Sequence, residues 1–319
     1  MDPLELSASI GHTYRVEHVL GAGGSGAVYK AWHVRLRKHV VIKELVHTSC
    51  NDDETRRNEV EALKNVKSEF LPQVLDFLTE GRHAYIVMEY IDGESFDKLL
   101  EQGRRFTETQ AARWYGQLAS VLVVIHKRSI YHRDIKPANI MLTPCGDVRL
   151  IDFGAALVEG ANTRIVSRSN GYASPEQHEV YQLMERARKV QTCEHSLVIC
   201  DNSYDIAETR HPESESDTKL TDICYPFSSL SSCCVDWKRS DIYSLGATMY
   251  HLITGKRPSG RAGEVAAMHD TGRLHKGIGD VIERSMRPDP AERFASATAL
   301  AAAIYSTRKQ ASKRLTPPL

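Results

Sequence analysis

The chain has 319 residues, of which 41% are hydrophobic and 26% charged, so it is long enough for one large globular domain or two lobes. The 41 basic residues balance the 41 acidic ones, so bulk charge gives no reason to expect nucleic acid or an anionic membrane as a partner. The longest apolar run, LASVLVVIH (118–126), is too short to cross a membrane and fits a buried helix. An acidic start without a secretory signal, and seven cysteines without framework spacing, predict a cytoplasmic protein.

The first part of the chain predicts a small β-rich unit. Residues 14–46 favour three strands, because β-branched residues and period-two alternation recur there, and the glycine turn GAGGSG separates the first two. Residues 51–66 predict a helix that Asn51 or Asp52 caps and whose apolar stripe faces inward. FLPQVLDFLTEGRHAYIVMEYI (70–91) predicts two strands around a turn.

From about residue 92 the pattern becomes helical, with the boundary at DGES. TETQAARWYGQLASVLVVIHKRS and DIYSLGATMYHLITG carry thick apolar stripes that predict buried helices, and a last helical region ends with ASATALAAAIYS. We therefore expect an α+β fold with two lobes, 14–91 and 92–305. Residues 1–13 form an extension, and 306–319 a basic, frayed tail.

The segment at about 179–235 departs from this pattern. It is rich in Ser, Asp and Glu, and it predicts a mobile or disordered loop with a short helix at YQLMERARKV. Its cysteines and histidines raise a zinc or redox hypothesis, but the spacing has no C-x₂-C pair, so an acidic loop is the simpler interpretation. These residues are Cys193, His195, Cys200, His211, Cys224, Cys233 and Cys234.

The glycine turn contains G-x-G-x-x-G at Gly21, Gly23 and Gly26, a pattern that lets backbone N–H groups approach a phosphate. A plain glycine hairpin is the alternative. A dinucleotide-binding loop is a second alternative, but it requires a helix directly after the glycines, whereas the following residues favour a strand. Glu44 lies near the spacing of its ribose-binding acid, but it directly follows the strand end VVIK.

Lys43 ends that strand, and a lone lysine there would usually face solvent. The predicted helix offers a partner, because Glu59 shares its inward face and an acid on that face needs a cation. Glu61 lies on the opposite side. We predict a Lys43–Glu59 ion pair that holds the lysine against phosphates.

YHRDIKPANIML (131–142) places an acid, a cation and an amide at offsets that packing does not require but phosphate and metal chemistry does. HRDIKPAN, IDFG and YASPE together resemble the protein kinase family, specifically the eukaryotic-type serine/threonine kinases that also occur in bacteria. The resemblance covers residues 14–176 and 237–305 and implies the two-lobed kinase fold, with one main helix in the small lobe.

The resemblance implies a role for each residue of the loop. Asp134 accepts or orients the proton of the attacking hydroxyl, and Lys136 neutralises the moving phosphoryl group. Asn139 and Asp152 hold Mg²⁺, with Mn²⁺ as a substitute; capping a strand end is the alternative for Asp152 alone. Lys136 follows the serine/threonine pattern, so proteins bearing Ser or Thr are the expected substrates.

For ATP, the resemblance implies a lid over the phosphates, an adenine pocket with Met88 at its rear, and hinge bonds from Glu89 and Ile91. The implied ATP-binding residues are Leu20, Gly21, Ala22, Gly23, Gly24, Ser25, Gly26, Ala27, Val28, Val41, Lys43, Glu59, Met88, Glu89, Ile91 and Met141.

The family pattern also implies how the loop is supported and regulated. Asp241 anchors the catalytic-loop backbone, Glu176 pairs with Arg293, and Leu63, His132 and Phe153 stack. Ser169 contacts Asp134 and Lys136, whereas Arg133 pairs with a phosphorylated activation loop. Thr163 and Ser167 are the candidate phosphosites, and ordinary loop hydroxyls are the equal alternative.

Two features depart from the family. Val41 stands where alanine usually covers the adenine ring, which puts nucleotide affinity in question, and Glu176 and Asp241 are 65 residues apart, several times the usual gap. The leading hypothesis is an ATP- and magnesium-dependent protein serine/threonine kinase that autophosphorylates its activation loop. A catalytically silent kinase-like binding module is the alternative, and a small-molecule kinase is disfavoured by Lys136 and YASPE. The sequence leaves the oligomeric state open.

Overall fold

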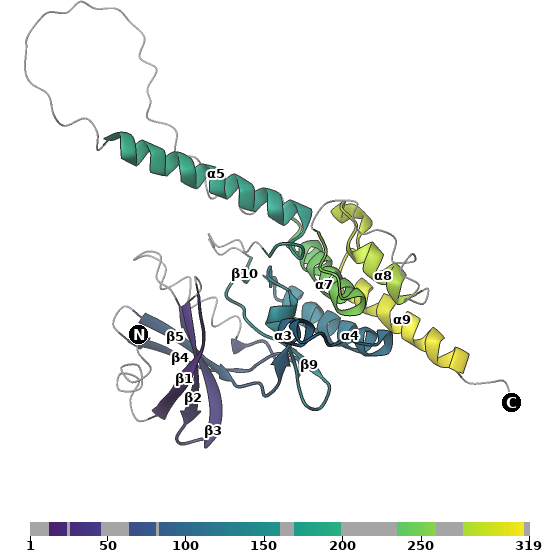
Figure 1. Cartoon of the computed structure of the whole chain (residues 1–319), viewed down its shortest axis with the longest axis horizontal. Helices are drawn as coiled ribbons and strands as arrows, with labels where there is room; N and C mark the ends of the chain where they lie inside the picture. Colours follow the sequence, from purple (N-terminus) through teal and green to yellow (C-terminus); the bar gives the residue numbers. More distant parts are fainter. Residues whose placement is uncertain are drawn as a thin grey trace, which may run out of the picture.

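A computed structural model describes residues 13–23, 26–45, 64–80, 83–159, 169–198, 235–259 and 277–315. A strand-rich N-terminal part and a helical C-terminal part lie side by side (Figure 1). This arrangement confirms the expected α+β, two-lobed fold. No helix in these ranges is both long and apolar enough to span a bilayer.

One antiparallel sheet of five strands forms the N-terminal part, in the order β1-β2-β3-β5-β4. The strands predicted from the alternation are therefore confirmed. They are β1 (Tyr14–Gly23), β2 (Gly26–His33), β3 (Lys38–Leu45), β4 (Val74–Glu80) and β5 (His83–Glu89).

The two faces of this sheet differ in burial because successive side chains of a strand point to opposite sides. On one face a fully buried cluster includes Tyr29, Val40, Ile42 and Val87. On the other face Val41 is only partly buried. The first face therefore holds the sheet together and leaves the second available for other contacts.

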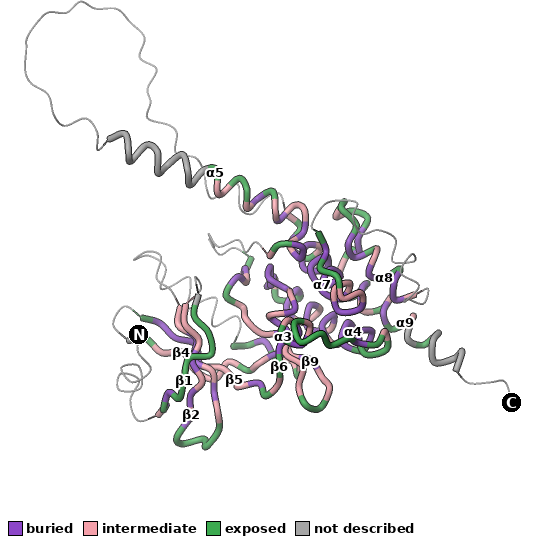
Figure 2. Tube along the Cα trace, viewed as in Figure 1, coloured by how far each residue is buried: buried purple, intermediate pink, exposed green. Residues whose placement is uncertain are grey.

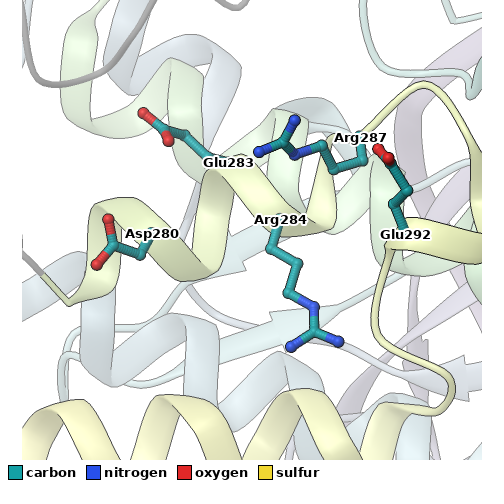
Figure 3. A pocket seen from close by; sticks show the side chains of 5 residues that line it. All are labelled: Asp280, Glu283, Arg284, Arg287 and Glu292. Atoms are coloured by element: carbon teal, nitrogen blue, oxygen red, sulfur yellow. The ribbon is translucent and has the colours of Figure 1, made fainter.

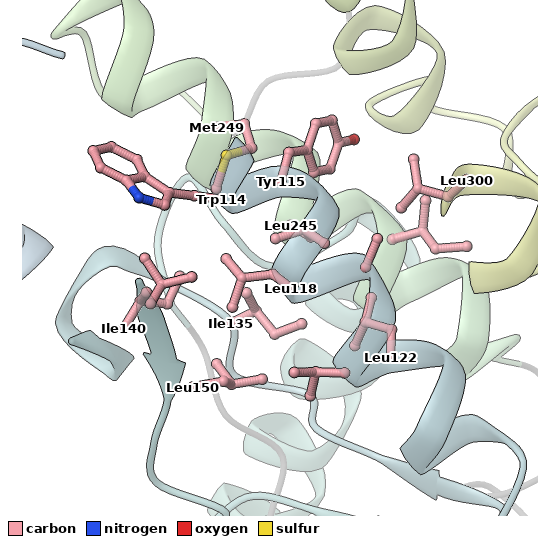
Figure 4. Packing of buried hydrophobic residues seen from close by; sticks show 14 of the residues in the cluster. Trp114, Tyr115, Leu118, Leu122, Ile135, Ile140, Leu150, Leu245, Met249 and Leu300 are labelled. Carbon is pink, nitrogen blue, oxygen red and sulfur yellow. The ribbon is translucent and has the colours of Figure 1, made fainter. Parts of the chain in front are cut away.

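Helices pack around one large core in the C-terminal part (Figures 2 and 4). The long helix α4 lies at the centre, and a capping box between Thr107 and Gln110 fixes where it begins. The C-terminal helices are α3 (Phe96–Glu101), α4 (Glu108–His126), α5 (Pro175–Val198), α7 (Trp237–Thr254), α8 (Ile278–Ser285) and α9 (Ala297–Leu315).

Short strands and turns connect these helices and carry the loops between them. They are β6 (Glu94–Ser95), β7 (Ile130–Tyr131), η2 (Pro137–Asn139), β8 (Ile140–Leu142), β9 (Val148–Leu150), β10 (Leu157–Val158) and η4 (Pro290–Glu292).

Two expectations about irregular segments need correction. The short helix expected at YQLMERARKV is confirmed, but it is part of α5, whose 24 residues continue to Val198, so the loop expected from about 179 does not begin there. The start signal lies inside YASPE: the Ser174 hydroxyl accepts from the Gln177 N–H, and Pro175 occupies the first helical position. The tail expected to fray from 306 is helical as far as Leu315, as a continuation of α9.

Gly246 of α7 packs tightly against the C-terminal end of α8. A Cβ there would lie 2.7 Å from the Cβ of Ser285 and 3.1 Å from the Cγ of Met286. We expect Gly246→Ala to lower the free energy of unfolding by ~1 kcal/mol, because overpacking outweighs the better helix propensity of alanine. Urea denaturation measures this, with Thr109→Ala on the exposed surface of α4 as the control. A stabilised Gly246→Ala variant would show that the two helices can separate freely.

Candidate functional site

Lys43 and Asp152 meet although 109 residues separate them in the sequence. The Lys43 side chain is almost fully buried on the second face of the sheet, and its Nζ forms an ion pair with Oδ1 of Asp152. Gly154 lies beside this pair, since a Cβ added there would lie 2.5 Å from Nζ of Lys43 and 3.1 Å from Oδ1 of Asp152. The glycine therefore makes room for the cation and the carboxylate to meet.

The Asp152 backbone adopts a left-handed conformation with φ of 64°, which is uncommon for residues other than glycine, although aspartate tolerates it better than most, and which occurs often at functional sites. Burial alone would raise the pKa of this carboxyl. The charge and hydrogen bond of Lys43, together with the Gly154 N–H, outweigh that effect and hold the pKa of Asp152 below its ordinary value. Asp152 is therefore ionised at neutral pH, ready to bind a cation.

Asp134 stands at the centre of a hydrogen-bonded cluster. Its Oδ1 accepts from Oγ of Ser169 at 2.5 Å, and its Oδ2 accepts from Nζ of Lys136 at 2.8 Å. The Lys136 Nζ also lies 3.2 Å from the Ser169 Oγ. The expected contact of Ser169 with both residues is thus confirmed. An acid, a cation and a hydroxyl from two separate segments meet at one point.

Asn139 completes this cluster and links it to Asp152. Its Nδ2 donates to the backbone carbonyl of Asp134 at 2.8 Å and to Oδ2 of Asp134 at 3.0 Å. The N–H of Ile151 donates to the Asn139 backbone carbonyl at 2.8 Å, which places Asn139 next to the residue that precedes Asp152. A hard divalent cation prefers oxygen ligands such as an amide oxygen and a carboxylate. Asn139 and Asp152, which lie close together, therefore fit such a cation.

A buried aspartate holds the loop that carries Asp134. Asp241 on α7 is completely buried and accepts from the backbone N–H groups of His132 at 2.9 Å and Arg133 at 2.8 Å. His126 of α4 lies 2.9 Å from the same carboxylate. Arg133 has a left-handed φ of 60°, so Asp241 stabilises a loop conformation that the chain would otherwise disfavour. The anchoring role expected of Asp241 is confirmed.

Arg133 points into the molecule. Its Nε donates to the Ala155 carbonyl at 2.7 Å, and its guanidinium lies 5.1 Å from the ring centroid of Trp237. Gln177 donates to the Arg133 carbonyl at 2.7 Å and receives a bond from Ser240. Sequence reasoning missed Gln177, Ser240 and Trp237, since nothing in the local pattern shows that α5 and α7 meet behind this loop.

Glu176 and Arg293 form the expected pair, in which Arg293 is buried and Glu176 is half-buried. The guanidinium of Arg293 donates to both oxygens of Glu176, at 2.6 and 2.9 Å, and lies 4.9 Å from the Tyr243 ring. Further bonds reach the carbonyls of Arg287, Pro288 and Arg239. This pair ties the start of α5 to α7 and to the turn before α9.

Several residues expected around ATP share the second face of the N-terminal sheet. Val28 pairs with Lys43 across β2 and β3, and Val41 pairs with Met88 across β3 and β5. Met141 of β8 and these valines are half-buried, and Leu20 is 47% exposed. One apolar face thus continues from the buried lysine toward β5.

The segment after β5 carries the expected hinge bonds. The Glu89 N–H donates to the Gln73 carbonyl at 2.9 Å and is therefore already used. The backbone N–H and carbonyl of Ile91 make no hydrogen bond within the described part of the chain. Because backbone polar groups are rarely left unpaired, Ile91 is the better placed of the two to bind a flat heterocycle.

The turn between β1 and β2 requires glycine because it packs closely against β3. Gly26 has φ of 107°, and a Cβ there would collide with the backbone carbonyl of Glu44 on β3. Gly21 and Ala22 are exposed on β1, and Gly23 pairs with Gly26. The Ala27 side chain packs against the buried cluster on the opposite face, so only its backbone can serve a ligand.

Other predicted residues lie outside the described ranges, among them Gly24, Ser25 and Glu59, so the Lys43–Glu59 pair stays a prediction. The same holds for the phosphosite candidates Thr163 and Ser167. Of the stacked residues, His132 and Phe153 have ring centroids 4.8 Å apart, whereas Leu63 is not described. The zinc hypothesis is likewise untested, since most of its residues are not described; no metal-binding group of His, Cys, Asp and Glu occurs in the described residues.

A separate surface pocket of about 420 Å³ lies at α8 and the turn before α9 (Figure 3). Its lining mixes both charges and contains none of the site residues above. The lining residues are Asp280, Glu283, Arg284, Arg287 and Glu292. Mixed charge without an apolar wall gives no small molecule an evident binding mode.

The chain belongs to the protein kinase family, since the family model for the protein kinase domain matches residues 14–187. Members of this family in general use ATP and a divalent metal ion. Together with the geometry described above, the match confirms the resemblance found in the sequence motifs.

Bacterial serine/threonine kinases are among the relatives. Serine/threonine-protein kinase pkn3 of Myxococcus xanthus is 28% identical over 327 residues, which cover 96% of this chain and 52% of the relative. PknA of Corynebacterium glutamicum is 36% identical over 184 residues, covering 54% and 39%, and PknL of Mycobacterium tuberculosis is 27% identical over 264 residues, covering 81% and 53%. The chain spans only about a quarter to three fifths of the length of the first curated relatives it matches.

Proposed function

We propose that the chain transfers the γ-phosphoryl group of ATP to Ser or Thr hydroxyls of proteins. The observation that supports this most directly is that the Lys43–Asp152 pair and the Asp134–Lys136 pair, from three segments of the chain, are linked through Asn139. The relatives are named serine/threonine kinases, and the position of Lys136 beside Asp134 agrees with that class of acceptor. We further propose that the chain phosphorylates its own activation loop, at Thr163 or Ser167.

Each group has a distinct part in the reaction. The buried Lys43 ammonium orients the α and β phosphates, and Lys136 neutralises charge that develops on the transferred group. Asp134 accepts a hydrogen bond from the acceptor hydroxyl in place of Ser169 and so directs its oxygen at the γ-phosphorus.

Asn139 and Asp152 would hold Mg²⁺, or Mn²⁺ in its place. The ion supplies positive charge that screens the phosphates of bound ATP. Nζ of Lys43 already forms an ion pair with Oδ1 of Asp152. The lysine and the metal ion would therefore share the carboxylate of Asp152. Asn139 keeps its amide nitrogen on Asp134, so only its oxygen is left to face a metal.

The Lys43→Met variant tests this proposal. We expect transfer from labelled ATP to a generic basic protein to fall by about 10²-fold, because methionine fills the same space without the charge that aligns the phosphates. Lys38→Met, at the exposed start of the same strand, is the matched control and should keep full activity. Transfer unchanged by Lys43→Met would exclude the assigned role. Nucleotide binding by a wild-type protein that transfers nothing would instead identify a silent kinase-like module.

A further inference from the structure

Two arginines and a histidine lie beside the segment that follows Ser169, and we name the arginines, Arg105 and Arg257, the cationic patch. Arg257 donates from Nε and Nη2 to the Asn170 carbonyl, at 2.9 and 2.6 Å. Its guanidinium also lies 5.3 Å from the centroid of the Tyr172 ring. Since Asn170 directly follows Ser169, which donates to Asp134, this arginine is only one residue away from the acid–cation cluster.

His251 and Arg105 converge on the same place, from α7 and from the loop before α4. The Tyr172 hydroxyl lies 2.6 Å from Nδ1 of His251. Arg105 packs over the end of α7, because a Cβ on Gly255 would lie 3.0 Å from its Cζ. The pKa of His251 is lowered by burial and then by the charges of Arg257 and Arg105, so both guanidinium groups act on one point.

The charge of this patch is not neutralised within the described residues. Arg105 and Arg257 are exposed, and neither forms an ion pair there. The charge of Asp97 also raises the pKa of Tyr172, so this carboxylate lies nearby. In the described residues it forms no hydrogen bond with either arginine. A helix C-terminus favours nearby cations, but in the described part of the chain neither arginine bonds to an α7 carbonyl, so this explanation does not account for both.

We infer that the cationic patch selects acceptor segments that carry an aspartate or glutamate close to the phosphorylated Ser or Thr. The inference rests on the proposed kinase activity and adds a substrate preference to it. An acceptor hydroxyl that takes the place of Ser169 at Asp134 brings its chain next to the segment that Arg257 holds, and a guanidinium binds a carboxylate with two parallel hydrogen bonds. Within the described residues Nε and Nη2 of Arg257 hold the Asn170 carbonyl and its third nitrogen, Nη1, makes no hydrogen bond, so Nη1 can take part in such a bond.

A peptide series tests this preference in the full chain. Each peptide has one Ser in an alanine–glycine background, with Asp, Ala or Lys placed in turn at the three positions before and after the Ser. For the wild-type protein we expect kcat/KM for the best Asp peptide to exceed that of its Ala counterpart about fivefold and to decline with added salt. The Lys peptide at that position should be the poorest.

Two variants, Arg105→Glu and Arg257→Lys, and one control identify the residues responsible. Arg105→Glu should abolish or reverse the ratio of Asp to Lys peptide, because it reverses the charge without touching the Asn170 carbonyl. Arg104→Glu is the matched control, since Arg104 is adjacent in sequence and exposed but lies 5.8 Å from the Phe106 ring; it should keep the ratio. Arg257→Lys should keep the preference for Asp while lowering kcat, because it retains charge but loses the paired bonds to Asn170.

A binding measurement separates this inference from the proposed function. Fluorescence anisotropy with Ala in place of the acceptor Ser reports peptide affinity without catalysis. Tighter binding of Asp than of Lys peptides that disappears in Arg105→Glu supports the patch, even for a protein without transfer activity. Equal binding of the Asp, Ala and Lys peptides, or an equal loss of preference in Arg104→Glu, overturns it, whatever the kinase assay shows.

Discussion

Asp134→Asn is expected to reduce phosphoryl transfer by about 10³-fold while leaving the fold and ATP binding intact. Asparagine has the shape of aspartate and can still accept from Ser169, but it cannot take up a proton or balance the Lys136 charge. The initial rate of transfer at saturating ATP measures the effect, and fluorescent-nucleotide titration checks binding.

The control for this experiment is Asp147→Asn, which removes an exposed carboxylate outside the site and should leave the rate unchanged. Transfer by Asp134→Asn within tenfold of wild type would show that another group orients the acceptor hydroxyl. A collapse of nucleotide binding would show that the substitution distorts the loop that Asp241 supports.

Arg293→Met is expected to lower the free energy of unfolding by about 3–5 kcal/mol, the largest stability effect we predict. Arg293 is 1% exposed, so its removal leaves the Glu176 carboxylate without its partner and deprives the carbonyls of Arg287, Pro288 and Arg239 of donors. Urea denaturation followed by circular dichroism measures the loss.

A matched control exists in the exposed Arg113–Asp147 pair, which has the same 2.6 Å separation. Arg113→Met should cost less than ~1 kcal/mol, because water screens and replaces an exposed ion pair. The double variant Glu176→Gln/Arg293→Met should lose less than the sum of its single changes, since both remove one interaction. Equal losses of unfolding free energy in Arg293→Met and Arg113→Met would show that the burial of Arg293 does not strengthen its ion pair.

Segments expected from local pattern were found where periodicity was strong. The β-branched residues of KHVVIKELV predict β3, and the period of two in a strand places Val41 and Lys43 on one face, as observed. Polar composition was misleading for α5, because the Ser174 cap and Pro175 specify a helix start that composition does not show. Similarly, Ala27 stands inside the glycine motif, yet its side chain belongs to the core.

The sequence by itself determined the chemistry of this protein. The chemical groups in HRDIKPAN and DFG lie within a few positions of one another. Their types and spacing can therefore be read without any structure. The fold decided which distant groups meet. Lys43 with Asp152, Asp241 with the Arg133 backbone, and Arg257 with Asn170 join segments 87 to 109 residues apart. Local periodicity fixes the face on which a side chain lies, but only the packing of helices and sheet determines what lies opposite that face.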